Sequence, residues 1–162
     1  MVGNRLNKET VHQILKTVDD PELAGVSIVD LGMIDQIDVT SSGKIFVRLI
    51  PTFTGCPALD FIERQVVQAL QQQGFTRIDV AFSFDLPWST TRITKAGIAS
   101  LRQNGIAVPT TPDEDFNWEV NCPYCESLFT SVDNLFGPTA CRSILYCHHC
   151  KNPFEAMKPI HS

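Results

Sequence analysis

The segments Cys122-Pro-Tyr-Cys125 and Cys147-His-His-Cys150 lie in the last third of the chain, with 21 residues between them. Each segment spaces two sulfurs so that one loop can wrap around a metal ion, and two such loops complete a tetrahedron of four thiolates. The pattern predicts a zinc ribbon with Cys122, Cys125, Cys147 and Cys150 as ligands, and iron in a rubredoxin-like site is the alternative. Four protein ligands leave no position for water, so the predicted site is structural.

Redox-active dithiols or disulfides are the other interpretation of this cysteine pattern. The chain has six cysteines, and in a reducing compartment a paired CxxC pattern favours metal. A thioredoxin-type motif opens a helix, whereas neither segment here precedes a helical pattern. Cys141 fits a small buried residue, and His148 and His149 fit surface positions better than donors to sulfur.

The ribbon is expected to be a small domain with its own boundaries. Four short apolar stretches near the cysteines are typical of strands: 116–120, 128–133, 142–146 and 154–157. Residues 108–115, VPTTPDED, have the composition of a linker. We therefore expect a first domain at 1–109, a linker at 110–116 and the ribbon at 117–162. A domain this small has a limited core, so bound metal should supply about 10 kcal/mol or more of folding free energy.

The first domain shows helical and strand periodicities in alternation. The predicted helices are 8–18, 57–73 and 94–104, and the predicted strands are 35–40, 44–50 and 77–84. Asn7 and Thr94 are suitable helix N-caps, and Gly74 and Gly105 are suitable helix stops. The order α-β-β-α-β-α predicts an α+β fold, in which a small three-stranded sheet with packed helices precedes the zinc-ribbon β domain.

Composition and charge exclude several classes of protein. The chain has 162 residues, 43 % hydrophobic and 19 % charged, which is ordinary for a globular protein. No signal peptide or membrane span is predicted, and the cytoplasm is the expected compartment. After Pro112 there are three Lys and Arg residues against seven Asp and Glu residues. An acidic ribbon of this kind disfavours nucleic acid as a partner.

Cys56 is the candidate reactive residue of the first domain. It stands between Gly55, which permits a tight turn, and Pro57, which is favoured at the first position of a helix. This predicts Cys56 as the helix N-cap, where the helix dipole and free N–H groups favour the thiolate. Such a thiolate can bind metal or act as a nucleophile, and a buried apolar role is equally open.

The remaining polar motifs of the first domain give weaker signals. In Asp20-Pro-Glu22 two carboxylates flank a rigid turn, and they can bind a hard metal or hydrogen-bond a loop. Simple helix termination with solvated acids is the alternative and is favoured by these residues alone. His12 lies within a predicted helix and there is no GxSxG, so no paired nucleophile and general base are evident. Catalytic residues are therefore not expected.

Several motifs together resemble a known family. DPE at 20–22, SIVDLGMI at 27–34, TGCP at 54–57, PWSTTRIT at 87–94 and GIAVP at 105–109 resemble the metal-sulfur cluster biosynthesis domain family. The ribbon segments CPYC, FGPTAC at 136–141, CHHC and NPFEAMKPI at 152–160 resemble the PaaD family of bacterial phenylacetate degradation. The resemblance covers about residues 8–160, with the motifs in the same order.

The resemblance implies a non-enzymatic accessory protein of the phenylacetyl-CoA ring 1,2-epoxidase, a multicomponent monooxygenase. The implied role is maturation of a metal centre, either the iron–sulfur cluster of the reductase or the diiron site of the oxygenase. The family's reactive cysteine falls on Cys56, and its supporting residues fall on Asp20, Glu22 and Thr54. Many relatives carry Asp-Trp where this chain has Thr91-Arg92, so a carboxylate role in that loop is not carried over.

The resemblance also implies cofactors and partners. Structural zinc and transient iron or an iron–sulfur cluster are the expected metals. Oxygenase or reductase components of the epoxidase and iron–sulfur assembly proteins are the expected partners. Cys56 offers one sulfur per chain, so cluster binding would need a homodimer, a partner or small thiols. The alternative function is a structural or regulatory subunit of the epoxidase complex, and a thiol enzyme that uses Cys56 is the third.

Overall fold

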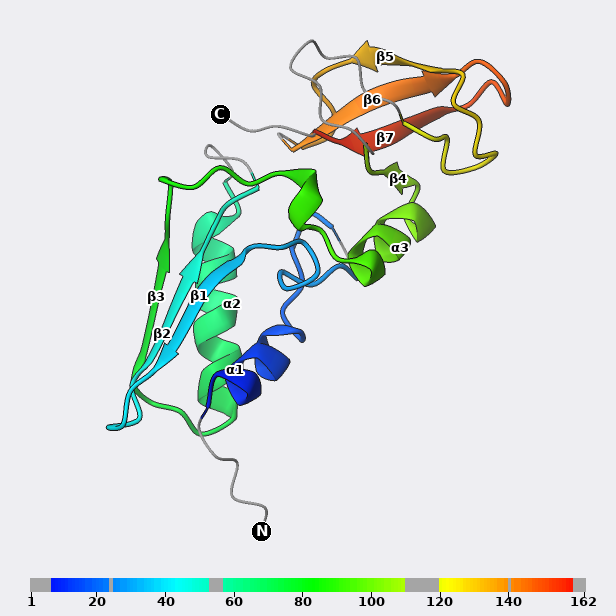
Figure 1. Cartoon of the computed structure of the whole chain (residues 1–162). Coiled ribbons are helices and arrows are strands. Elements are labelled where there is room, and N and C mark those ends of the chain that lie inside the picture. Colours follow the sequence, from blue (N-terminus) through cyan, green and yellow to red (C-terminus); the bar gives the residue numbers. More distant parts are fainter. Residues whose placement is uncertain (1–6, 24, 53–56, 110–119, 140, 159–162) are drawn as a thin grey trace. The chain divides into compact units, whose positions relative to one another are not determined.

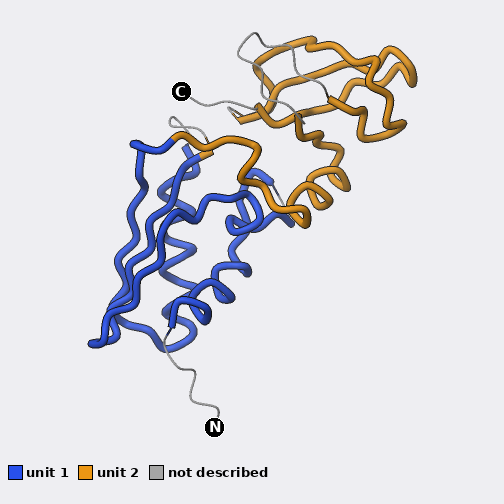
Figure 2. Tube along the Cα trace, viewed as in Figure 1, with its two compact units in different colours: residues 1–51, 57–86 blue, residues 52–56, 87–162 orange. Residues whose placement is uncertain are grey.

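The computed structural model describes residues 7–23, 25–52, 57–109, 120–139 and 141–158. The chain divides into two compact units, shown in Figure 2. The first unit comprises Met1–Pro51 and Pro57–Leu86, and the second comprises Thr52–Cys56 and Pro87–Ser162. No helix in the described part of the chain has the length and apolar character that crossing a membrane would require.

The first unit is a three-stranded sheet with two helices on one side of it (Figure 1). Its elements are α1 (Lys8–Leu15), β1 (Ile34–Val39), β2 (Ile45–Leu49), α2 (Leu59–Gln72) and β3 (Ile78–Phe82). The sheet order is β1-β2-β3, with β1 and β2 antiparallel and β2 and β3 parallel. A parallel pair needs a crossover connection, and α2 supplies it.

Apolar residues at two different periods build the core of this unit. In β2, Ile45, Val47 and Leu49 alternate with half-buried residues and are themselves fully buried. In α2, the buried positions Ile62, Val66 and Leu70 recur every four residues and form one stripe. The strand period of two and the helix period near four therefore bring the two apolar faces into one core, as the sequence predicts.

Helix α1 begins where the sequence predicts and ends earlier. The Oδ1 atom of Asn7 accepts a hydrogen bond from the Thr10 N–H at 2.8 Å, which confirms the N-cap. The predicted end was residue 18, but the helix stops at Leu15. The N–H groups of Thr17 and Val18 bond to carbonyls three residues back, at 3.1 Å each, because the last turn tightens as the chain leaves the helix.

The second unit contains a helical segment followed by a four-stranded sheet. Its elements are the short 3₁₀ helix η1 (Thr90–Arg92), α3 (Lys95–Gln103), β4 (Ile106–Ala107), β5 (Thr130–Asn134), β6 (Arg142–Cys147) and β7 (Pro153–Met157). The sheet order is β4-β7-β6-β5, and only the β4–β7 pair of these described strands is parallel. The Thr94 hydroxyl accepts the Gly97 N–H at 3.0 Å, which confirms the predicted cap of α3.

Strand β4 was not expected from the sequence. It is two residues long, too short to show a period, and its partner β7 starts at Pro153, far along the chain. The expected linker at 110–116 and most of the expected strand at 116–120 lie outside the described residues. The proposed domain boundary therefore stays a prediction. Along the chain, the last change from the first compact unit to the second falls between Leu86 and Pro87.

We predict that Leu70→Ala destabilises the first unit. The Leu70 side chain is fully buried in α2, so its removal costs transfer free energy and leaves a cavity. The expected loss is about 2–5 kcal/mol in the free energy of unfolding, measured by urea denaturation. Gln68→Ala, on an exposed position of the same helix, is the control and should change that value by less than about 0.5 kcal/mol. Equal losses in the two variants would contradict the assignment of the core face.

Candidate metal centre

Four sulfur atoms of the second unit converge on one point. The Sγ atoms of Cys122, Cys125, Cys147 and Cys150 all lie within 4.8 Å of one another. The Cys122–Cys150 distance is 3.7 Å and the Cys125–Cys147 distance is 3.6 Å. In a tetrahedral site with metal–sulfur bonds of about 2.3 Å, neighbouring sulfurs are about 3.8 Å apart. The spacing therefore fits one four-coordinate ion bound by thiolates.

A specific backbone turn presents the first pair of sulfurs. The Cys122 N–H donates to the Ser127 carbonyl at 2.9 Å, and the Glu126 N–H donates back to the Cys122 carbonyl at 2.9 Å. Glu126 has a φ of 64°, in the left-handed region that residues other than glycine adopt rarely. This turn closes the loop and holds Cys122 and Cys125 on the same side.

The second pair of sulfurs is presented by a turn of the same construction. The Cys147 N–H donates to the Asn152 carbonyl at 3.0 Å, and the Lys151 N–H donates to the Cys147 carbonyl at 2.9 Å. Lys151 has a φ of 63°. The two loops thus repeat one conformation, so four sulfurs from distant parts of the chain reach a nearly symmetric arrangement.

N–H groups surround the sulfurs and favour their ionised form. The backbone N–H groups of Tyr124 and Cys150 point at Cys122 Sγ and Cys147 Sγ, at 3.4 and 3.5 Å. The side-chain amide of Asn152 lies 3.5 Å from Cys150 Sγ. Hydrogen bonds to a thiolate lower the energy of its charge. The roles of Asn152, Glu126 and Lys151 were not predicted from the sequence. Their one signal in the sequence is that they stand at fixed spacings from the cysteines in two loops of equal length.

Without a cation the four thiols cannot all ionise together. Burial raises the pKa of Cys147. Hydrogen bonds from the N–H groups of Cys150 and His149 and from the neighbouring thiols outweigh burial and lower the pKa to about 6. The N–H of Ser127 lowers the pKa of Cys125, but burial and the other three thiols outweigh it and raise the value to about 12. Burial is also the main cause of the raised pKa of Cys122. A divalent cation removes this conflict, because it stabilises all four negative charges.

The core beneath this centre is small. Its members are all buried and lie within the second unit: Ala107, Val120, Cys122, Leu145, Cys147, Phe154 and Ala156. Two of these residues are the predicted metal ligands Cys122 and Cys147, so the metal centre and the apolar core of the ribbon form one cluster. Loss of the metal is therefore expected to disrupt the core as well.

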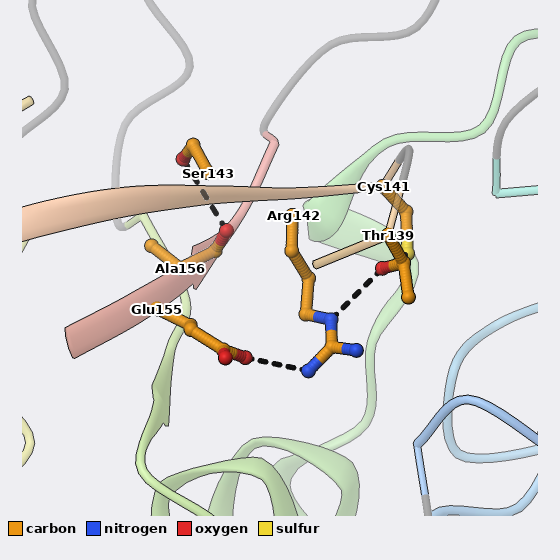
Figure 3. Close-up of polar contacts among 6 residues, drawn as sticks. All are labelled: Thr139, Cys141, Arg142, Ser143, Glu155 and Ala156. Carbon is orange, nitrogen blue, oxygen red and sulfur yellow. Dashed lines mark hydrogen bonds and ion pairs between the residues drawn. The ribbon is translucent and has the colours of Figure 1, made fainter. Parts of the chain in front are cut away.

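The other cysteine of the ribbon belongs to a separate polar group. Figure 3 shows Arg142 between Thr139 and Glu155, with Nε 2.9 Å from the Thr139 hydroxyl and Nη1 2.5 Å from Oε2 of Glu155. The same Thr139 hydroxyl lies 3.3 Å from Cys141 Sγ. Cys141 is buried and is not part of the four-sulfur cluster, as the sequence predicts.

Helix α3 ends against the first metal loop. Arg102 forms an ion pair of 3.2 Å with Glu126, and Asn121 donates to the Glu126 carbonyl at 3.1 Å. Gly105 has a φ of 74°, and a Cβ atom there would lie 2.9 Å from the Tyr124 hydroxyl oxygen. The sequence predicts Gly105 as the helix stop. The structure adds that its missing side chain also makes room for Tyr124.

Asp20 in the first unit holds a turn. The side chain is 4 % exposed, and Oδ1 accepts the Glu22 N–H at 2.8 Å. The Asp20 N–H donates to the Val26 carbonyl at 3.0 Å, and the Asp20 carbonyl accepts the Leu23 N–H at 3.2 Å. Of the alternatives for this motif, the solvated acid is therefore wrong for Asp20, because the carboxylate is buried and hydrogen-bonded. Glu22 is half-buried.

Cys56 and Thr54 lie outside the described residues. The predicted position of Cys56 as a helix cap is nevertheless wrong, because α2 starts at Leu59 and its N-cap residue is Ala58. The Ile62 N–H makes a helical hydrogen bond to the Ala58 carbonyl at 2.9 Å, and Pro57 and Ala58 form a turn before the helix. Proline is favoured in the first turn of a helix but does not determine at which residue the helix begins. This explains why α2 begins two residues later than predicted.

Comparison with known proteins assigns a class to each part of the chain. Residues 8–81 match the family model for an iron-sulfur cluster assembly protein, and residues 107–158 match the PaaD zinc beta ribbon domain. A domain of unknown function, DUF59, from Bacillus anthracis has the same fold, with a TM-score of 0.55 and 27 % identity over 57 % of this chain and 89 % of that one. The chain thus joins an iron-sulfur cluster assembly domain to a zinc ribbon.

Two curated relatives narrow the class. A subunit of the "Putative 1,2-phenylacetyl-CoA epoxidase" of Escherichia coli K12 is 33 % identical over 155 residues, 93 % of each chain. A "Fe-S protein maturation auxiliary factor" from Porphyromonas gingivalis is 30 % identical over 58 % of this chain and 90 % of its own length. The chain belongs to the family of the Escherichia coli epoxidase subunit, the PaaD family.

We predict that Cys125→Ser abolishes stoichiometric metal binding, because a hydroxyl replaces one of four thiolates. Metal analysis of the purified protein should give one zinc per chain for the wild type and much less for the variant. Cys141→Ser, a change of the same kind outside the cluster, should keep the full zinc content. Equal zinc content in wild type and Cys125→Ser would contradict the ligand assignment.

We also predict a steep loss of zinc affinity as pH falls. Because the pKa values of Cys122 and Cys125 are raised, zinc must displace at least two protons at neutral pH. Each displaced proton weakens binding tenfold per pH unit, so affinity should fall about a hundredfold or more per unit as pH is lowered. Competition with a chromophoric chelator at several pH values measures this slope. A flat profile near neutrality would show that the thiols are already ionised.

Proposed function

We propose that this chain is a maturation factor for the metal centre of a phenylacetyl-CoA epoxidase. The observation that carries the proposal is the union, in one chain, of an iron-sulfur cluster assembly domain with the ribbon of the PaaD family. The names of two relatives support the proposal, since one is named as an epoxidase subunit and the other as an auxiliary factor of Fe-S protein maturation. The client centre would be the reductase's iron–sulfur cluster or the oxygenase's diiron site.

In this proposal Cys56 makes the transient contact with iron or a cluster. Asp20, Glu22 and Thr54 would shape the surroundings of its thiol. The hydrogen bond between the Asp20 carboxylate and the Glu22 N–H supports a positioning role for Asp20, because it fixes the turn that carries both acids. One thiol leaves most positions on iron open, so a client, a small thiol or a second copy of the chain would supply the others.

The ribbon would hold structural zinc. All four sulfurs lie at distances suited to one tetrahedral ion, so no ligand position is left for a substrate or water. Iron in a rubredoxin-like site has the same geometry, and metal analysis separates the two. A closed, rigid metal domain that does no chemistry is suited to docking, and we assign that role to the ribbon.

We also propose that the chain acts as a non-enzymatic accessory protein. The relatives are named as auxiliary factors or as an epoxidase subunit, which supports an accessory protein. Its partners would be the oxygenase or reductase component of the epoxidase and the proteins that supply iron–sulfur clusters. The alternative, a permanent subunit of the complex, is favoured by the name of the Escherichia coli relative. A subunit copurifies with active epoxidase, whereas a maturation factor is dispensable after the client is loaded.

We predict that Cys56→Ala lowers the metal content of the client. The variant should be produced with the epoxidase components in cells that lack the wild-type chain, and iron should be measured in each purified component. Loss of iron in one component, with normal zinc in the ribbon of the variant, is the expected result. Cys141→Ser is the matched control and should support full loading. A client that Cys56→Ala loads as fully as the wild type would remove the proposed role of this thiol.

A further inference from the structure

The strand β5 and its flanks expose an unusual amount of apolar surface. The described residues include nine exposed large hydrophobic side chains, and five of them fall within residues 128–136. We call these five the β5 strip: Leu128, Phe129, Val132, Leu135 and Phe136. Phe136 is 77 % exposed and Phe129 is 68 % exposed, the two largest values among the nine. Clustered exposure of this kind marks an interaction surface more often than scattered apolar residues do.

The strip is not part of the ribbon's own core. In β6 the buried side chains are Ser143, Leu145 and Cys147, and the small core is built on that face. None of the five strip residues belongs to this core. These side chains therefore lie outside the buried cluster of the ribbon and offer apolar surface to another molecule.

Contacts of the two aromatic residues hold parts of the strip in place. The Phe129 ring lies 4.9 Å from the His148 ring, and His148 in turn contacts the Tyr146 ring at 5.2 Å. The His148 Nε2 atom lies 2.8 Å from the Ser131 hydroxyl. At the other end the Lys158 ammonium lies 5.1 Å from the centre of the Phe136 ring. Side chains that are already ordered lose less entropy on binding.

The geometry of β5 decides between two modes of binding. β5 lies at the end of the sheet order and pairs only with β6 among the described strands, so addition of a partner strand is the first mode. However, the register shifts between Val132 and Asn134, and the exposed Asp133 lies at this irregularity. A bulge with a charge on an edge strand blocks continuous strand pairing. The strip therefore binds through its side chains.

Charge indicates the chemistry of the partner. Within the strip segment the charged residue is Asp133. Within the expected ribbon, residues 117–162, four acidic residues face three basic ones, a net charge of −1. Four thiolates around one divalent cation contribute a further −2. A surface with an apolar centre in an acidic domain is complementary to an apolar patch bordered by Lys and Arg.

A second copy of this chain fits the strip less well. In a twofold dimer the strip would face its own copy, with Asp133 and the same acidic domain on each side. The whole chain has a net charge of −5, so the two copies would repel each other. Electrostatics therefore favours a different protein as the occupant.

We propose that the β5 strip is the surface by which the ribbon docks onto the client protein, through an apolar patch of the client bordered by basic residues. This inference rests on the proposed function and adds the surface and the chemistry of the partner. Phe129 and Phe136 are the central anchors, and Asp133 sets the electrostatic orientation.

The test measures binding of the zinc-loaded full chain to the purified, metal-free oxygenase and reductase components, each by isothermal titration calorimetry. Wild type should bind one component, and binding should weaken as ionic strength rises. The double variant Phe129→Ala/Phe136→Ala should bind at least about tenfold more weakly. Phe61→Ala/Phe84→Ala removes two exposed aromatic residues of the first unit and should leave the affinity unchanged. Zinc content and circular dichroism establish that each variant is folded.

Three outcomes would overturn the docking surface. They are undiminished binding by the Phe129→Ala/Phe136→Ala variant, no binding of either component by wild type, and a wild-type dimer that this variant converts to a monomer. Cys56→Ala separates this inference from the proposed function, because it should dock normally and fail only in loading. If the strip variant docks normally while Cys56→Ala still lowers client iron, the docking surface fails and the proposed function stands. If clients load fully without the chain, both fail.

Discussion

The attraction between one divalent cation and four thiolates is the constraint on which the second unit depends. The apolar core of the ribbon is small and includes two of the cysteines, so core and metal centre cannot form independently. Two left-handed residues, Glu126 and Lys151, close the metal loops in a conformation that costs free energy outside glycine. The metal–sulfur bonds offset this strain and the mutual repulsion of the thiolates, which explains how so few residues keep a defined fold.

The first unit follows a different physical logic. Its stability comes from apolar stripes on α1 and α2 packed on the sheet, and its polar features are local. Asp20, for example, is buried and bonded to its own turn. The chain thus combines a conventionally packed unit that carries a hydrogen-bonded acidic turn with a unit whose core is built around a metal centre.

Much of this structure is predictable from the sequence, and the exceptions share a cause. Asn7 and Thr94 cap their helices as expected, because a cap depends on residues within one turn. The ligand cysteines were predictable because their spacing is itself the signal. The strand β4 was not, since two residues carry no period and their partner lies far along the chain. The start of α2 was placed two residues early, because proline is tolerated throughout the first turn.

The parallel pairing of β4 with β7 limits where this protein can be cut into pieces. Ile106 and Ala107 follow shortly after α3, yet their neighbours in the sheet are Glu155 and Ala156. A fragment that starts after them keeps every ligand cysteine but strips one side of β7, leaving unpaired backbone N–H and C=O groups beside the buried Phe154. Such a bare strand invites self-association. A recombinant ribbon for structural work should therefore retain the polypeptide from α3 onward.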